Sequence, residues 1–126
     1  MSDLVSIHPE VTAALEAREP VVALETTLVS HGFPAAEGAE VAWECEERVR
    51  AAGAVPATVG ILDGAVRVGL ERADLERFAL TDDARKVGPR DLATAAVQGA
   101  IGATTVGGTL AAVSYTHLTL PTTPYV

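Results

Sequence analysis

Residues 21–32 read Val21-Val22-Ala23-Leu24-Glu25-Thr26-Thr27-Leu28-Val29-Ser30-His31-Gly32, and this stretch decides the fold. Its first four residues are apolar without polar alternation, a pattern typical of a strand buried on both faces of a parallel sheet. A carboxylate, three hydroxyls and an imidazole follow within eight residues. Because open α/β sheets bind ligands beyond the carboxyl ends of their strands, Glu25 is the first candidate catalytic residue.

The same residues also allow a purely structural interpretation. Glu25 fits a solvated carboxylate at the end of a strand, and Thr27 or Ser30 fits a strand residue or a helix cap. His31 before Gly32 fits a turn. The spacing alone favours this interpretation, so the function must be argued from patterns elsewhere in the chain.

Composition restricts the class of protein and of partner. The 126 residues suit one domain, and a hydrophobic content of 48% provides a core. Nine basic residues against seventeen acidic ones give a net charge of −8, which disfavours nucleic acids and anionic membranes as partners. The single cysteine, Cys45, excludes an internal disulfide and indicates no metal cluster. The first ten residues do not resemble a signal peptide, and we expect a cytoplasmic protein.

The order of the expected elements predicts an α/β layered fold. Pro9 near the first turn starts a helix that ends near Arg18, and Gly53 ends a long helix that begins after Pro34. Asp63-Gly64 predicts a hairpin turn between two strands. The expected strands are 21–24, 55–62, 65–69 and 103–106, and further helices are expected at 71–78, at 91–99 and after Gly107-Gly108.

Residues 86–92, Lys86-Val87-Gly88-Pro89-Arg90-Asp91-Leu92, form a second candidate site. A phosphate or carboxylate fits between Lys86 and the N-terminus of the following helix. The alternative is a solvated loop lysine followed by a proline at the first helical position. The pair Gly107-Gly108 permits a close approach of the backbone to a ligand.

The end of the chain differs in character from the rest. From Ser114 onward the sequence holds no Asp, Glu, Lys or Arg and no period that would bury one face. We therefore expect 1–112 to be the globular part and 113–126 to be a non-native tail that resembles adapter sequence. The alternative is a genuine disordered tail rich in Thr and Pro.

Five ordered blocks between residues 8 and 112 resemble the pseudouridine-5′-phosphate glycosidase family. They are VVALETTLVSHG (21–32), GAVPATVGILDG (53–64), VGL (68–70), KVGPRDL (86–92) and GATTV (102–106). The resemblance implies a layered α/β/α core and reversible cleavage of the C–C glycosidic bond of pseudouridine 5′-phosphate, giving uracil and ribose 5-phosphate. It also implies a divalent metal, typically Mn²⁺, and a homotrimer. Glu25 matches the proton donor, and Lys86 and Val106 match substrate contacts.

Two functional residues of the family have no counterpart in the matching blocks. The family's nucleophilic lysine and its metal-binding aspartate both lie beyond the last block, so the chain resembles an N-terminal fragment with no metal ligand. We expect these 126 residues alone to be inactive, an expectation that uracil release by the purified chain would contradict.

Two alternatives from other classes stay open. The region around Lys86 and the Gly107-Gly108 turn also fit a phosphosugar or sugar-kinase-like enzyme, which would bind nucleoside triphosphates. The acidic helices fit a non-catalytic α/β interaction domain, in which Glu25 would have no catalytic role.

Overall fold

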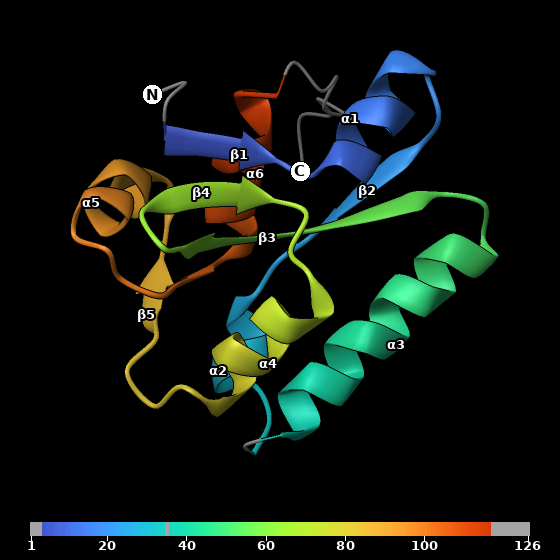
Figure 1. Ribbon diagram of the computed structural model, residues 1–126. Coiled ribbons are helices and arrows are strands. Elements are labelled where there is room, and N and C mark those ends of the chain that lie inside the picture. The colour runs from blue at the N-terminus through green and yellow to red at the C-terminus, as the bar shows by residue number, and fades with distance from the viewer. Residues whose placement is uncertain (1–3, 35, 117–126) are drawn as a thin grey trace.

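The computed structural model describes residues 4–34 and 36–116, which form one sheet between two layers of helices (Figure 1). This confirms the predicted α/β/α class. The elements are β1 (Val5–Ile7), α1 (Pro9–Glu16), β2 (Val21–Leu24), α2 (Thr27–His31), α3 (Glu37–Ala51), β3 (Val55–Leu62), β4 (Ala65–Val68), α4 (Arg72–Leu80), β5 (Arg85–Val87), the 3-10 helix η2 (Pro89–Asp91), α5 (Leu92–Val97), β6 (Gly102–Thr104) and α6 (Val106–Ser114).

The sheet is built around β3, which is buried along almost its whole length. The strand order is β1-β4-β3-β6-β5, and β2 pairs with the first half of β3. β2 runs parallel to residues 55–58 of β3, whereas β4 and β6 run antiparallel to its second half. The predicted Asp63-Gly64 turn joins β3 to β4, with φ angles of 51° and 80°.

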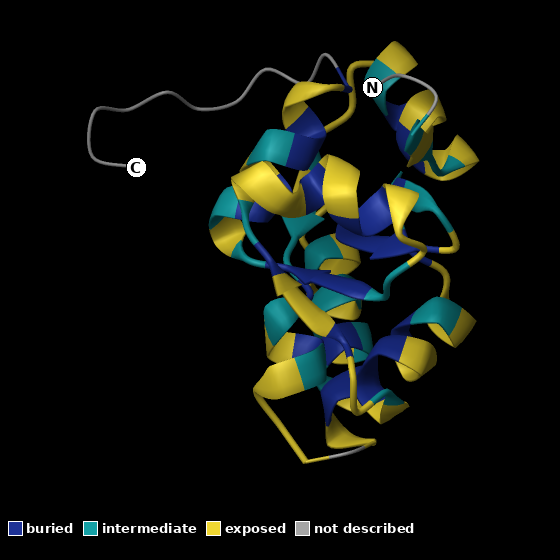
Figure 2. Cartoon of the chain, turned by 90° about the vertical axis from the view of Figure 1, so that its left-hand side faces the viewer, coloured by how far each residue is buried: buried dark blue, intermediate teal, exposed yellow. Residues whose placement is uncertain are grey.

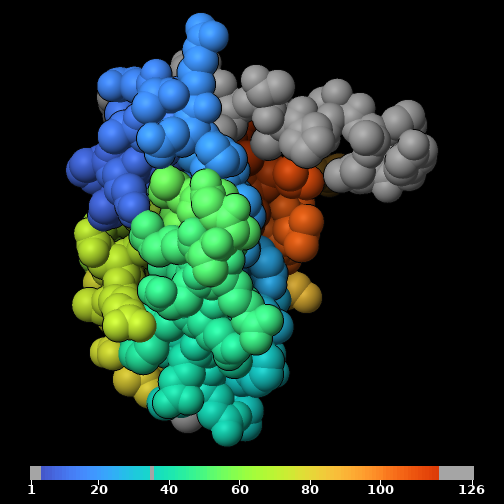
Figure 3. Space-filling model, turned by 90° about the vertical axis from the view of Figure 1, so that its right-hand side faces the viewer, coloured from blue at the N-terminus to red at the C-terminus, as the bar shows by residue number. Residues whose placement is uncertain are grey.

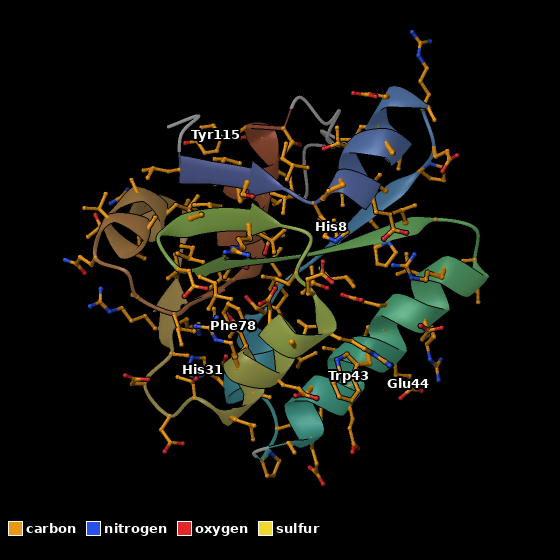
Figure 4. All side chains as sticks on the ribbon, in the orientation of Figure 1. His8, His31, Trp43, Glu44, Phe78 and Tyr115 are labelled. Carbon is orange, nitrogen blue, oxygen red and sulfur yellow. The ribbon has the colours of Figure 1, made fainter. Side chains whose placement is uncertain are left out.

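Each face of the sheet carries its own apolar core, and buried residues concentrate in the strands between the two helical layers (Figure 2). Helices α1, α5 and α6 cover one face and α2, α3 and α4 cover the other. Phe78 of α4, labelled in Figure 4, is fully buried, and a Cβ on Gly60 of β3 would lie 2.6 Å from its ring. Glycine at position 60 therefore allows α4 to pack tightly on the sheet.

Several local predictions are confirmed. The strands at 21–24 and 55–62 have the expected bounds, and the helix α1 starts at Pro9 as expected. His8 caps it by accepting the Glu10 N–H at 3.0 Å. Gly53, at a φ of 91°, follows α3 as expected. Four elements were not predicted: β1, β5, η2 and the helix α2, which begins directly after Glu25 and Thr26.

The predicted tail 113–126 is only partly described. Helix α6 continues to Ser114, and Val113 is buried in the core beneath α1, α5 and α6. Residues 117–126 lie outside the described residues, so the assignment of a non-native tail stays a prediction. Over 4–34 and 36–116, no helix has the length and apolar character needed to cross a membrane.

Candidate active site at the junction of β2 and β6

Strands β2 and β6 lie end to end along the same edge of β3, with their carboxyl ends facing each other. β2 is parallel and β6 antiparallel to β3, and the Thr26 N–H donates to the Thr104 carbonyl at 3.1 Å. β5 is parallel to β6, and the Val87 carbonyl accepts the Thr105 N–H at 3.0 Å. The loops that follow β2, β5 and β6 therefore converge, as expected for a ligand site in an open α/β sheet.

Glu25 is the half-buried residue that follows β2 at this junction. Its Oε1 accepts the N–H of Leu28 at 3.2 Å, so the carboxylate satisfies a free amide in the first turn of α2. On the molecular surface the segment from β2 to α2 lies between α3 and α6 (Figure 3). Glu25 lines a small cavity of about 80 Å³ toward α3 and a larger cavity of about 220 Å³ toward α6.

The cavity toward α6 brings two of the predicted site residues together. Glu25 and Val106 both line it, and the rest of its wall is Ala23, Leu24, Thr109 and Leu110. Val106 is the first residue of α6 and is 64% exposed. A single carboxylate in a mostly apolar hollow, next to the start of a helix, is a suitable arrangement for proton transfer to a bound molecule.

Lys86 lies elsewhere. It is an exposed residue of β5, not of a loop, and it lines a separate cavity of about 410 Å³ with Asp91 and Thr94. The Asp91 carboxylate accepts the Gly88 N–H at 3.2 Å. The protein's own carboxylate therefore occupies the helix N-terminus at which the sequence predicted a bound phosphate or carboxylate. The geometry thus joins Glu25 to Val106 but leaves Lys86 outside their cavity.

The glycine pair at the start of α6 has a packing role. A Cβ on Gly108 would lie well inside van der Waals distance of the Val87 carbonyl oxygen. Glycine at position 108 therefore allows a close approach of α6 to β5. Thr105 caps the same helix, because its Oγ1 accepts the Gly108 N–H at 3.0 Å.

A second polar cleft of about 340 Å³ lies where β1 and β4 end, between α1 and α3. His8 Nε2 lies 2.7 Å from Glu71 Oε1, and both Arg50 guanidinium amines bond the Glu10 carboxylate, at 2.6 and 2.9 Å. The Arg50 hydrogen bonds hold the pKa of Glu10 below its usual range. None of the predicted site residues lies in this cleft.

Glu46 also lines that cleft. Among the residues that the structure describes, it is the only carboxylate whose pKa is raised. Burial raises the pKa of Glu46, and this effect exceeds the opposing effects of the Thr58 hydroxyl, which donates to Oε2 at 2.6 Å, and of Arg50. The folded chain therefore binds the Glu46 proton more tightly than the unfolded chain does.

We expect Glu46→Gln to stabilise the protein most at neutral pH. The stability from the protonated carboxyl is fully present below the unfolded-state pKa, and it is lost as the pH rises through the raised folded-state pKa. Gln cannot ionise and still accepts the Thr58 hydroxyl. The gain in Tm over the parent chain should therefore be larger at about pH 7.5 than at about pH 4. Calorimetry at both values, with exposed Glu47→Gln as the control, checks this; an equal gain at both values would contradict it.

A manganese site does not fit the described residues. Within 4–34 and 36–116, no group of three or more His, Cys, Asp or Glu side chains is placed to hold a metal ion.

Comparison with known proteins places the chain in a family. The family described as "Indigoidine synthase A like protein" matches residues 10–123. The chain belongs to this family. Three relatives named pseudouridine-5′-phosphate glycosidase, from Rhodospirillum centenum, Salinispora tropica and Staphylococcus aureus, are 55%, 54% and 46% identical over 112, 102 and 101 residues. They confirm the resemblance stated from the sequence.

Two solved structures share the fold of this indigoidine synthase A-like chain. A prealnumycin C-glycosynthase in complex with ribulose 5-phosphate superposes with a TM-score of 0.77 at 42% identity, over 89% of this chain and 36% of that one. An indigoidine synthase A-like protein from Thermotoga maritima gives 0.68 at 34% identity, over 78% and 33%. The sequence matches cover 80–89% of this chain, which spans about a third of the length of the curated relatives it matches.

Proposed function

We propose that this chain supplies the proton-transferring carboxyl group of a pseudouridine-5′-phosphate glycosidase. That enzyme would break the C–C glycosidic bond of pseudouridine 5′-phosphate reversibly, giving uracil and ribose 5-phosphate. The observation that carries the proposal is the shared cavity of Glu25 and Val106 at the junction of β2 and β6. The names of the relatives supply the substrate, and the ribulose 5-phosphate bound by the structural neighbour supports a phosphorylated pentose.

The chemistry requires a group such as Glu25. When the bond from the ribose to carbon 5 of uracil breaks, the electron pair of that bond stays on the uracil carbon, which must take up a proton. Carbon 1 of the ribose loses that pair, and oxygen from water bonds to it, so that the products are uracil and ribose 5-phosphate. A carboxyl group held at a strand end and tied to the Leu28 amide has few orientations open to it, so it is suited to deliver that proton.

Lys86, the one lysine of the chain, is proposed as a contact for the substrate phosphate. It forms no ion pair within the part of the chain that the structure describes. An exposed ammonium without a carboxylate partner is available to an anion, and lysine binds phosphate as a compact point charge.

We expect Lys86→Gln to weaken substrate binding more than turnover when it is made in a hybrid enzyme, in which this chain replaces the aligned third of the Rhodospirillum centenum relative. Loss of one charge-assisted phosphate contact should raise KM for pseudouridine 5′-phosphate about tenfold, equivalent to about 1.4 kcal/mol, with a smaller change in kcat. Arg48→Gln, which removes an equal charge from the exposed face of α3, should leave KM unchanged. An unchanged KM in Lys86→Gln would contradict the assignment.

Three finer properties are proposed with this function. The active enzyme is a homotrimer, it uses Mn²⁺ held by family residues that lie beyond the last block matched here, and it works in the cytoplasm. These follow from the family resemblance. The metal is checked by uracil release before and after dialysis against a chelator, and the trimer by light scattering of the active enzyme.

A hybrid enzyme tests the proposed function. The aligned third of the Rhodospirillum centenum relative is replaced by the corresponding residues of this chain, and uracil release from pseudouridine 5′-phosphate is followed by chromatography. We expect the hybrid to release uracil. A folded hybrid that releases none, beside an active unmodified relative, would contradict the proposal.

A further inference from the structure

Three buried threonines connect the two sides of the candidate active site. Thr26 follows Glu25, Thr104 ends β6 two residues before Val106, and Thr109 lies in the first turns of α6. Thr26 and Thr104 are fully buried and Thr109 is 6% exposed. We call Thr26, Thr104 and Thr109 the threonine cluster.

Thr26 connects to β6 in an unusual way. Its N–H donates to the Thr104 carbonyl at 3.1 Å, and the Thr104 N–H donates to Thr26 Oγ1 at 2.7 Å. In an ordinary strand pair the second bond would end on a backbone carbonyl. The Thr26 carbonyl instead accepts the N–H groups of Val29 and Ser30 at 3.0 and 3.2 Å, which start α2. The hydroxyl therefore replaces the carbonyl, and the chain begins a helix while staying bonded to the sheet.

The hydroxyls of the cluster also lie close to one another and to β3, with Thr26 Oγ1 3.3 Å and Thr109 Oγ1 2.9 Å from Thr104 Oγ1. The hydroxyls of Thr26 and Thr104 both lie within donating distance of the Val59 carbonyl, at 2.8 and 2.9 Å, and a carbonyl oxygen can accept two bonds. With both protons used there, the Thr109 hydroxyl is the donor in its 2.9 Å contact with Thr104 Oγ1. The cluster is then fully satisfied, and it ties β2, β3, β6 and α6 together.

We propose that the threonine cluster positions the Glu25 carboxyl relative to the start of α6, with Thr26 as the main positioning residue. This inference rests on the proposed function. Glu25 is one residue from Thr26, and Val106 is two residues from Thr104 and three from Thr109. The separation of Glu25 and Val106 across their cavity is therefore set by the hydrogen bonds of the cluster, of whose members Thr109 lines the cavity while Thr26 and Thr104 lie behind its wall. A hydroxyl on the β-carbon at position 26 is needed, which Ser and Thr supply and Val does not.

The test compares Thr26→Val with Thr26→Ser in the hybrid enzyme. Val has nearly the shape of Thr but leaves the Thr104 N–H without an acceptor. We expect Thr26→Val to lower kcat for uracil release about a hundredfold, as a misplacement of roughly 1 Å at a catalytic group does, while KM for pseudouridine 5′-phosphate changes little. Thr26→Ser, which keeps a hydroxyl at this position, should retain most of the kcat of the unsubstituted hybrid. Ser30→Ala, which removes a hydroxyl bonded to the Phe78 carbonyl at 2.8 Å, should leave kcat close to that of the hybrid.

The outcomes separate the two proposals. If the unsubstituted hybrid releases no uracil, the proposed function fails. If it is active and a folded Thr26→Val variant keeps its kcat, or if Thr26→Ser loses as much as Thr26→Val, the positioning role is wrong while the function stands. If circular dichroism shows that Thr26→Val does not fold, Thr109→Val is the deciding variant, because it keeps the hydrogen bonds between Thr26 and Thr104. A fall in its kcat with unchanged KM supports the positioning role. An unchanged kcat overturns that role.

Discussion

Glu25→Gln in the hybrid enzyme is expected to lower kcat for uracil release by about 10³-fold, within the range that general acid–base groups contribute. Gln has the size of Glu, and its side-chain oxygen still accepts the Leu28 N–H that the Glu25 carboxylate accepts at 3.2 Å. The substitution therefore keeps the start of α2 and removes only the transferable proton. Tm should change little, and kcat should fall much more than the affinity for pseudouridine 5′-phosphate.

The control for this substitution is Glu76→Gln. Glu76 is an exposed glutamate of α4 on the face of the sheet that α2 and α3 also cover. The Glu76→Gln hybrid should turn over substrate at the rate of the unsubstituted hybrid. If Glu25→Gln did the same, Glu25 would be only the amide cap of α2, and the proposed role would be wrong.

Gly108→Ala is expected to destabilise the 126-residue chain by about 2 kcal/mol. The added methyl group meets the Val87 carbonyl, a backbone atom that cannot move away without shifting β5. Overpacking of this kind costs up to about 3 kcal/mol, and the better helix propensity of Ala returns about 1 kcal/mol. Chemical denaturation measures the difference in the free energy of unfolding.

Gly107→Ala provides the matched control one residue earlier in α6. Its Cβ would lie 3.3 Å from Cγ of Pro89, a ring carbon at the surface that has room to adjust. We expect a change near zero or a small stabilisation from helix propensity. Equal effects of the two substitutions would contradict the close packing of α6 on β5.

Local sequence patterns predicted the central part of the fold. The apolar run of β3, the Asp63-Gly64 turn and Gly53 after α3 each depend on neighbours in the sequence, and each was placed correctly. Glu25 was singled out because it follows an apolar run that predicted a strand buried on both faces of a parallel sheet. That burial was wrong: among the described strands β2 pairs only with β3, in a mixed sheet, its other residues are only half-buried, and Val22 is 40% exposed. The position after a strand end was nevertheless correct, and the structure places Glu25 at a convergence of strand ends.

Long-range pairing explains what the sequence did not predict. β1 and β5 are three-residue strands whose partners lie about sixty and seventeen residues away, at Val66 and Gly102, so no local period marks them. The helix α2 starts directly after β2 because the Thr26 hydroxyl replaces its carbonyl in the bond to Thr104. The stretch 21–32 holds three hydroxyls, and only the fold shows that the first one, on Thr26, takes the place of a backbone acceptor.

The separation of Lys86 from Glu25 has the same origin. Lys86 lies on β5, at the edge of the sheet, and pairs with Ala103 of β6. Glu25 reaches β6 from the other side, through Thr26. The two residues are therefore placed by different strand pairings, and the order of the blocks along the chain does not determine their distance.

A crystal structure of the Glu25→Gln hybrid with pseudouridine 5′-phosphate tests the central claim most directly. The substitution should slow turnover enough for the substrate to stay intact in the crystal. We predict that the bound nucleotide lies between residue 25 and the backbone of Val106, at the junction of β2 and β6. A nucleotide bound elsewhere, with that cavity empty, would contradict the account.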